Sequence, residues 1–141
     1  MARFDLFDPE QAPRGVSTLI KTPLLEGGRV DFDSYTRQVE HVVDVGTCLT
    51  VPGMRGCETW TLSEEERVRC LEVTLEICKD RTPVCATVAG ISIPDLIAAA
   101  RRAEDMGADM GPVAEVDRAP LSGSALVAVA AAAVDARLVP V

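Results

Sequence analysis

The chain has 141 residues, with 14 Lys and Arg against 22 Asp and Glu and a formal net charge of −8. This length suffices for one domain with a buried core, but a complete eight-fold βα barrel typically needs about 250 residues. The acidic balance, without a basic cluster, argues against a nucleic-acid surface, because phosphate binding gathers Lys and Arg on one face. No apolar run approaches the ~20 residues of a membrane span, and the N-terminus lacks the pattern of a signal peptide, so we expect a cytoplasmic protein.

The cysteines and the single histidine do not predict a metal site or a disulfide framework. No CxxC pair occurs among the five cysteines, which we expect to be small buried side chains: Cys48, Cys57, Cys70, Cys78 and Cys85. His41 lies in a helical pattern, and its spacing from Cys48 and Cys57 does not make a ligand set.

The first elements in the chain form a strand and a turn after a loose arm over residues 1–14. The β-rich run from Val16 to Ile20 predicts a strand that ends at Thr22-Pro23, since Pro cannot donate to a central ladder. Residues 25–29 contain Gly27-Gly28 and predict a turn.

A helix follows this turn. Either Asp31 or Asp33 can cap it, and Gly46 is placed to close it. Its apolar side chains recur at helical spacing: Tyr35, Val39, Val42 and Val43.

The stretch from Val51 to Arg67 predicts a strand, a loop and a helix. Cys48 to Val51 is the strand, and the loop over residues 53–61 is the first place to look for chemistry, because ligands meet βα units at the carboxyl ends of strands. Ser63 followed by Glu66 predicts a capping box at the start of a helix that runs to about Lys79. The stripe expected to be buried on this helix comprises Val68, Leu71, Leu75 and Cys78.

A third strand and helix follow. Residues 84–88 predict the strand, with Ala89-Gly90 as the turn after it, and Ser92, Pro94 and Asp95 predict the helix start. Gly107 suits the position just past the helix end. The face expected to be buried comprises Leu96, Ile97, Ala100 and Ala103.

The order βαβαβα implies parallel strands joined by right-handed crossovers, as in an open doubly wound sheet or in part of a barrel. A fourth strand is due after residue 109, but Gly111-Pro112 interrupts it, and residues 113–117 are a weak substitute. The divergent tail, residues 111–141, is rich in Ala and Val from Arg118 onward, and it predicts a helix from Ser124 to Arg137.

Four motifs in order resemble the dihydrodipicolinate synthase/N-acetylneuraminate lyase family. They cover about residues 15–110 with almost no gaps. The motifs are GVSTLIKTPL from Gly15, GRVDFD from Gly28, the segment from Gly46 that ends in Thr61-Leu62-Ser63, and the run from Pro83 to AEDMGAD at Ala103–Asp109.

The resemblance implies an α/β fold of the (β/α)8 TIM-barrel type, truncated here to about the first three to four βα units. It implies class I aldolase chemistry on pyruvate or a related 2-oxo acid. In that chemistry a lysine on a later strand forms a Schiff base and a tyrosine relays protons, without a metal or an organic cofactor. It also implies a homo-oligomer for the full-length family, with neither nucleic acid nor membrane as a partner.

This chain departs from the family pattern at the sites that matter most. In the family a Thr-Thr pair offers hydroxyls to the substrate carboxylate; aligned without a gap, residues 54–58 replace that segment and only Glu58 matches. Sliding by one residue matches Gly53 and Gly56 instead and still puts Arg55 at a Thr position.

The substrate-binding residues expected from this comparison are Thr22, Arg55, Gly56 and Glu58. The guanidinium of Arg55 suits a bidentate contact with a carboxylate, although a solvated loop arginine is an equal alternative. Cys57 beside Glu58 is a poor thiolate, and Trp60 is expected to pack rather than to hold substrate.

The catalytic residues are expected to be missing. Lys21 belongs to the first strand, Lys79 to the end of the second helix, and Tyr35 to the first helix. We therefore expect an N-terminal portion of a Schiff-base lyase that is inactive alone, with open sheet edges that favour association. A shifted reading frame would explain the change of composition after Met110. The alternative is a non-catalytic α/β module that binds a partner or a small anion.

Overall fold

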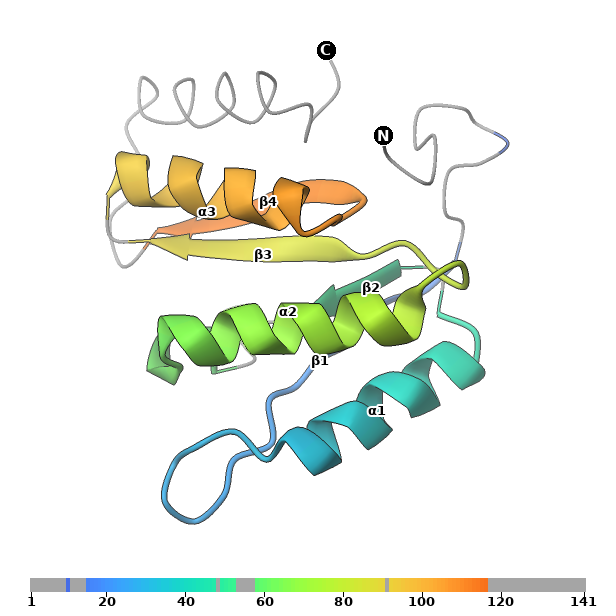
Figure 1. Cartoon of the computed structure of the whole chain (residues 1–141). Coiled ribbons are helices and arrows are strands. Elements are labelled where there is room, and N and C mark those ends of the chain that lie inside the picture. The colour runs from blue at the N-terminus through green and yellow to red at the C-terminus, as the bar shows by residue number, and fades with distance from the viewer. Residues whose placement is uncertain (1–9, 11–14, 48, 53–57, 91, 117–141) are drawn as a thin grey trace.

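The computed structural model describes residues 10, 15–47, 49–52, 58–90 and 92–116 (Figure 1). The elements follow one another in the expected alternation: β1 (Ser17–Ile20), α1 (Phe32–Asp44), β2 (Leu49–Pro52), the 3₁₀ turn η2 (Thr59–Thr61), α2 (Glu64–Cys78), β3 (Cys85–Gly90), α3 (Ile93–Asp105) and β4 (Met110–Val116). The predicted arm, except Glu10, and the helix predicted over residues 124–137 lie outside the described residues.

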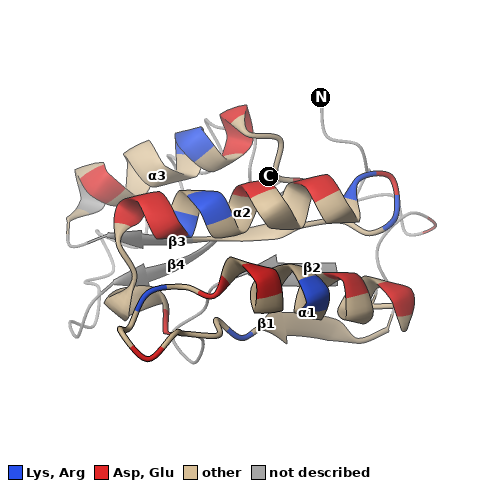
Figure 2. Cartoon of the chain, turned by 60° about the horizontal axis from the view of Figure 1, so that its bottom comes forward, with Lys and Arg blue, Asp and Glu red and all other residues tan. Residues whose placement is uncertain are grey.

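The strands pair in parallel, as the βα order predicted. β1 pairs with β2, and β3 pairs with β4. In the described part of the chain these two ladders are separate two-stranded sheets, and they do not close a barrel. The three helices lie on one side of the strands, which is clear when Figures 1 and 2 are compared. The structure is therefore an open α/β layer with the carboxyl ends of its strands free to form a site.

Local sequence signals set the helix ends. Asp31, rather than Asp33, caps α1, and its carboxylate accepts from the Ser34 amide at 3.0 Å. The capping box at Ser63 is confirmed: its hydroxyl accepts from the Glu66 amide at 3.1 Å, and its amide donates to the Glu66 carboxylate at 3.0 Å. Ser92 and Asp95 form the same reciprocal pair at the start of α3. Two otherwise unpaired backbone donors are satisfied at each box.

Glycines end α1 and α3. Gly46 and Gly107 have φ of +92° and +96°, which favours glycine over residues with a Cβ. At α3 the Gly107 amide donates to Glu104 at 2.8 Å and the Ala108 amide to Ala103 at 3.0 Å, a Schellman pattern. The prediction that these residues close the helices is confirmed.

The buried stripe of α2 differs from the prediction. Its buried residues are Cys70, Val73, Thr74 and Cys78, whereas Val68, Leu71 and Leu75 are only half-buried. α2 lies between α1 and α3, so two of its sides are covered (Figure 1). Thr74 can be buried because its hydroxyl donates to the Cys70 carbonyl at 2.8 Å and lies 3.0 Å from the Tyr35 hydroxyl. An apolar pattern does not find a threonine that is satisfied in this way.

β3 and β4 are longer than expected. Ala89 and Gly90, predicted as a turn, pair with Glu115 and Val116 in the ladder. The fourth strand starts at Met110 and continues through Gly111-Pro112. The ladder is irregular there: Cys85 pairs with Met110 and Thr87 pairs with Val113, so β4 advances by three residues where β3 advances by two. The extra residue of this bulge lets the strand hold a proline, which cannot donate to a regular ladder.

Candidate substrate-binding site

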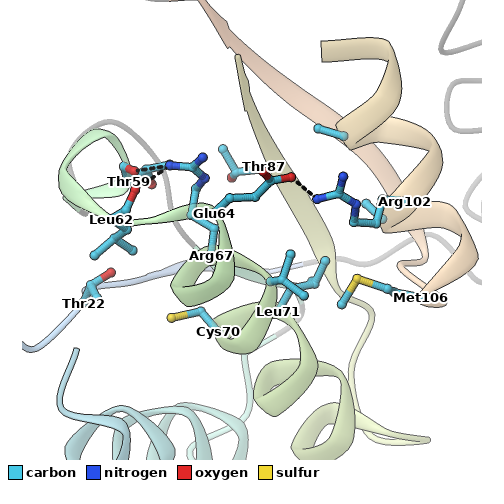
Figure 3. Close-up of a pocket in the computed structure, with 13 residues that line it drawn as sticks. Thr22, Thr59, Leu62, Glu64, Arg67, Cys70, Leu71, Thr87, Arg102 and Met106 are labelled. Carbon is cyan, nitrogen blue, oxygen red and sulfur yellow. Dashed lines mark hydrogen bonds and ion pairs between the residues drawn. The ribbon is translucent and has the colours of Figure 1, made fainter. Parts of the chain in front are cut away.

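The candidate site lies where β1 and β2 lead into their loops. Thr22 follows β1 by two residues, and Thr59 begins the 3₁₀ turn that follows β2. Both are buried, with exposed fractions of 6% and 2%. Both also line one cavity (Figure 3). Thr22, which the sequence analysis expected to line a pocket, thus lines this cavity.

The cavity lies between α2 and α3, with Thr87 of β3 in its wall. It has an empty volume of about 700 Å³, part of which is open solvent. Its polar lining includes three threonines, one from each of the regions after β1, after β2 and within β3: Thr22, Thr59 and Thr87. The Thr87 hydroxyl oxygen is buried without a hydrogen-bond partner among the described residues. The rest of the wall is largely apolar, with Leu62, Leu71 and Met106 as its larger apolar side chains.

Arg67 fixes the η2 turn from the second turn of α2. Its Nη1 donates to the Leu62 carbonyl at 2.7 Å and, more weakly, to the Thr59 carbonyl at 3.4 Å (Figure 3). A charged donor bridging two carbonyls makes a strong hydrogen-bonded contact. The end of the β2–α2 loop is therefore held against the helix that follows it.

Glu58 stands just before η2 in a left-handed conformation, with φ of 63°. Its carbonyl accepts from the Thr61 amide at 2.9 Å and from the Thr61 hydroxyl at 2.8 Å, which offsets the cost of this backbone region. Its carboxylate oxygen Oε2 is buried and has no hydrogen-bond partner among the described residues. Glu58 does not line the cavity itself but adjoins Thr59, which does.

Of the four predicted binding residues, the structure therefore brings Thr22 to the cavity and Glu58 to its border. Arg55 and Gly56 lie outside the described residues, as does Cys57. Trp60 is half-buried in η2.

Two of the residues that line the cavity form an ion pair. The carboxylate of Glu64 accepts from the guanidinium of Arg102, so that α2 and α3 are joined (Figure 3). The hydrogen bond and the charge of Arg102 lower the pKa of Glu64. Both side chains are largely exposed, at 64% and 47%, so water and salt screen the pair and it contributes little to stability. The described part of the cavity therefore presents mixed charge at its rim rather than a single sign.

The groups expected to lack a catalytic role are placed away from the cavity. Tyr35 is fully buried between α1 and α2, with its hydroxyl on Thr74. Lys21 and Lys79 are exposed, and neither lines the cavity.

The cysteine and histidine chemistry is equally limited. Burial, followed by the charge of Glu66, raises the pKa of Cys70 to about 12, so this thiol is no nucleophile at neutral pH. His41 is exposed on α1. Within the described ranges no three His, Cys, Asp or Glu side chains gather as metal ligands, and no helix there could cross a membrane.

Sequence reasoning missed Thr59, Arg67 and Thr87. The first two carry a usable signal, since Thr59 precedes the Thr61-Leu62-Ser63 motif and Arg67 follows the cap by four residues, one turn into the helix. Thr87 carries none, because an alternating strand gives no sign of which threonine faces a cavity.

Comparison with known proteins settles the family. The model of the dihydrodipicolinate synthetase family matches residues 12–113. The chain belongs to this family. A curated relative, the 4-hydroxy-tetrahydrodipicolinate synthase of Acidiphilium cryptum, is 35% identical over 95 residues, which are 67% of this chain and 32% of that protein. The chain thus spans about a third of the length of such relatives.

Solved structures of the family support the same placement. The 4-hydroxy-tetrahydrodipicolinate synthase of Methylacidiphilum fumariolicum matches with a TM-score of 0.73 and 26% identity, over 84% of this chain and 41% of that one. The N-acetylneuraminate lyase of Fusobacterium nucleatum matches with a TM-score of 0.76 over 88% of this chain and 43% of that one. At 16% identity this second match shows the fold alone. The described part of this chain thus shares part of the TIM-barrel fold of these proteins.

Proposed function

We propose that this chain carries the N-terminal βα units of a class I aldolase-type lyase that acts on pyruvate or a related 2-oxo acid. In this chemistry a lysine amine condenses with the oxo carbon, water leaves, and the protonated imine accepts the electrons of the adjacent bond. The observation that carries the proposal is the family match over residues 12–113, together with the cavity that Thr22, after β1, and Thr59, after β2, both line.

In this proposal the chain contributes substrate binding rather than the covalent step. Thr22 lines the pocket, Glu58 and Gly56 shape the β2–α2 loop, and Arg55 receives the substrate carboxylate in a bidentate contact. Arginine suits this last role because its planar fork matches two carboxylate oxygens. An arginine would then replace the pair of hydroxyls expected at this place in the family.

The same proposal makes the 141-residue chain inactive by itself. The Schiff base needs a lysine at the substrate carbon, but Lys21 and Lys79 are exposed outside the cavity. The tyrosine of the proton relay needs a free hydroxyl at the site, but Tyr35 is fully buried against Thr74.

Borohydride trapping tests both halves of the proposal. Pyruvate and borohydride are added to the 141-residue chain and to a chimera in which residues 15–110 replace the matching segment of the Acidiphilium cryptum synthase. We expect a reduced pyruvate adduct, seen by intact mass, on the chimera alone. An adduct at Lys21 or Lys79 would show that the chain is not inactive, and a folded chimera without an adduct would refute the retained binding site.

Arg55→Ala in the same chimera tests the carboxylate contact. Losing a charge-assisted contact should weaken 2-oxo acid binding by roughly ten- to a hundredfold. The matched control is Arg81→Ala, since Arg81 pairs with Asp44 at the far end of α1. Unchanged affinity in Arg55→Ala would leave this residue as a solvated loop arginine.

A non-catalytic α/β module is the second candidate. It is favoured by the capped helices and by a buried core that the described residues form within this chain. Sedimentation and amide exchange separate it from a dependent fragment. A monodisperse chain with protected helices supports the module, whereas a fluctuating or aggregating chain supports the fragment.

A further inference from the structure

One carboxylate on α2 joins two loops that are distant in sequence. Glu66 accepts from the Ser63 amide at 3.0 Å through Oε2 and from the Val30 amide at 3.2 Å through Oε1. The Arg29 guanidinium lies 3.9 Å from the same Oε1. The Glu66 side chain is only 13% exposed. Its capping role uses one oxygen, and the other reaches the loop between β1 and α1.

The β1–α1 loop is a closed unit. Its amides and carbonyls pair internally: Leu25 donates to Arg29 at 2.8 Å, and Gly28 donates to Leu25 at 2.8 Å. Leu24 and Val30 form an antiparallel bridge at its base. Val30 is 5% exposed, so its amide needs a partner within the protein. Whatever holds Val30 therefore holds the base of the loop that begins just after Thr22.

Arg67, the residue after Glu66, holds the end of the β2–α2 loop in a similar way. It holds the carbonyls of Thr59 and Leu62 at the end of the β2–α2 loop. Adjacent side chains in the first turns of α2 thus each secure one βα loop. The two loops carry Thr22 and Thr59, which face a common cavity.

We propose that Glu66 is a positioning residue, whose carboxylate fixes the β1–α1 loop to α2 and so sets Thr22 against the Arg67-held η2 turn. This role of Glu66 adds to the proposed function, and its effect on substrate binding rests on that proposed function. Glu66 does not line the cavity. It acts through Val30 and Ser63, and it determines how far apart the two walls of the site stand.

The charged and titratable groups around Glu66 make this contact sensitive to acid. Arg29 faces it from the β1–α1 loop, and Cys70 lies one turn further along α2, with Tyr35 of α1 on that thiol. The amides of Ser63 and Val30 lower the pKa of Glu66. The contact is complete above the ordinary carboxyl range and is lost as the pH falls through the lowered value. Arg29 is the cation near it, and Cys70 stays neutral.

Amide hydrogen exchange on the 141-residue chain tests the proposal without any turnover. We compare wild type with Glu66→Gln and Glu66→Ala, and Glu65→Gln is the matched control because Glu65 is an exposed carboxylate on the same turn. In Glu66→Ala we expect the Val30 amide to exchange about tenfold faster, while Val39 in α1 serves as the internal reference. Glu65→Gln should leave both amides unchanged.

A pH series separates positioning from general support of the fold. In wild type the protection of Val30, relative to Val39, should fall as the pH drops below the ordinary carboxyl range, and in Glu66→Gln this step should disappear. The proposal would be overturned if the Val30 amide were unprotected in wild type. It would also be overturned if the Glu65 and Glu66 variants changed the exchange of this amide equally. If the Glu66→Ala variant does not fold, the Glu66→Gln variant tests the proposal instead. Glutamine keeps the shape of glutamate but has only one side-chain oxygen that can accept a hydrogen bond.

The chimera distinguishes this inference from the proposed function. There Glu66→Gln should raise the KM for the 2-oxo acid several-fold with less change in kcat. If the chimera forms no pyruvate adduct while Val30 behaves as expected, the proposed function fails and the positioning role of Glu66 stands.

Discussion

The described residues form two hydrophobic cores, which differ in the size of their side chains. The core between α1 and α2 contains large side chains that are fully buried, such as Ile20, Tyr35 and Val39. The core under α3 contains Leu96 and three alanines: Ala86, Ala100 and Ala103. Because the hydrophobic gain scales with the apolar area removed from water, the first core should contribute most of the stability. The second core depends more on its helix cap and on the β3–β4 ladder.

One buried acid couples the two halves. The Asp109 carboxylate accepts from the Val84 amide at 3.0 Å, and the Asp109 amide donates to the Val84 carbonyl at 3.0 Å. Val84 belongs to the first core, whereas Asp109 directly precedes β4. The weaker half is thus tied to the stronger one at the start of β3.

The largest expected effect comes from removing the centre of the first core. Tyr35→Ala should lower the free energy of unfolding by about 3–5 kcal/mol, because it empties a fully buried aromatic site. Urea unfolding followed by circular dichroism measures it. Tyr35→Phe is the control and should cost about 1 kcal/mol, since Thr74 keeps its bond to the Cys70 carbonyl. Equal losses in both variants would mean that the hydroxyl, and not the packing, dominates.

Leu96→Ala breaks the second core. Leu96 is its one large buried side chain, and its truncation should cost about 2–3 kcal/mol. The comparison of the two cores predicts a local response, in which amides of α3, β3 and β4 lose protection while those of α1 keep it. Exchange measured by NMR checks this. A uniform loss over α1 as well would show that the two cores unfold as one unit.

The sequence predicted well what local chemistry determines. The capping box at Ser63, the helix start at Ser92 and the glycine at 107 depend on residues a few positions apart, so they can be found in the sequence. The order and parallel pairing of the strands also followed from the alternation of patterns. The buried stripe of α2 and the course of β4 did not, because they depend on partners far away: Thr74 on Tyr35, and Pro112 on a bulge opposite β3.

The candidate site shows the same division. Thr22 was found because it ends a strand, where βα proteins bind ligands. Arg67 and Glu66 were seen as helix residues only, since nothing in a linear pattern tells that their side chains reach Leu62 and Val30. The roles of Arg55 and Gly56 remain proposals.

The two helix caps offer a matched pair across the two halves. Ser63→Ala and Ser92→Ala should each cost about 1 kcal/mol, because each removes an acceptor from the first turn of its helix. The two variants should differ in which amides lose protection from exchange. Ser63→Ala should lower protection at the start of α2 but leave Val30 nearly unchanged, because the backbone amide of residue 63 still donates to the Glu66 carboxylate, whereas Ser92→Ala should affect α3 alone. Thermal unfolding and amide exchange together check both statements, and identical exchange patterns in the two variants would contradict a local effect of each cap.

The smallest effect concerns acid. The Ser34 side chain and amide lower the pKa of Asp31, and the amides of Ser63 and Val30 lower that of Glu66. A carboxyl whose pKa is lower in the folded than in the unfolded state stabilises the fold at neutral pH, and this contribution is lost as the pH falls through the folded value. We therefore expect protection at the starts of α1 and α2 to decrease as the pH falls below the ordinary carboxyl range, and Asp31→Asn to remove the α1 part. Asp33→Asn is the control, because Asp33 is exposed on the first turn of α1 and is not the cap. If both variants flattened the pH profile equally, the general charge of the first turn, and not the cap hydrogen bonds, would account for the acid sensitivity of this half.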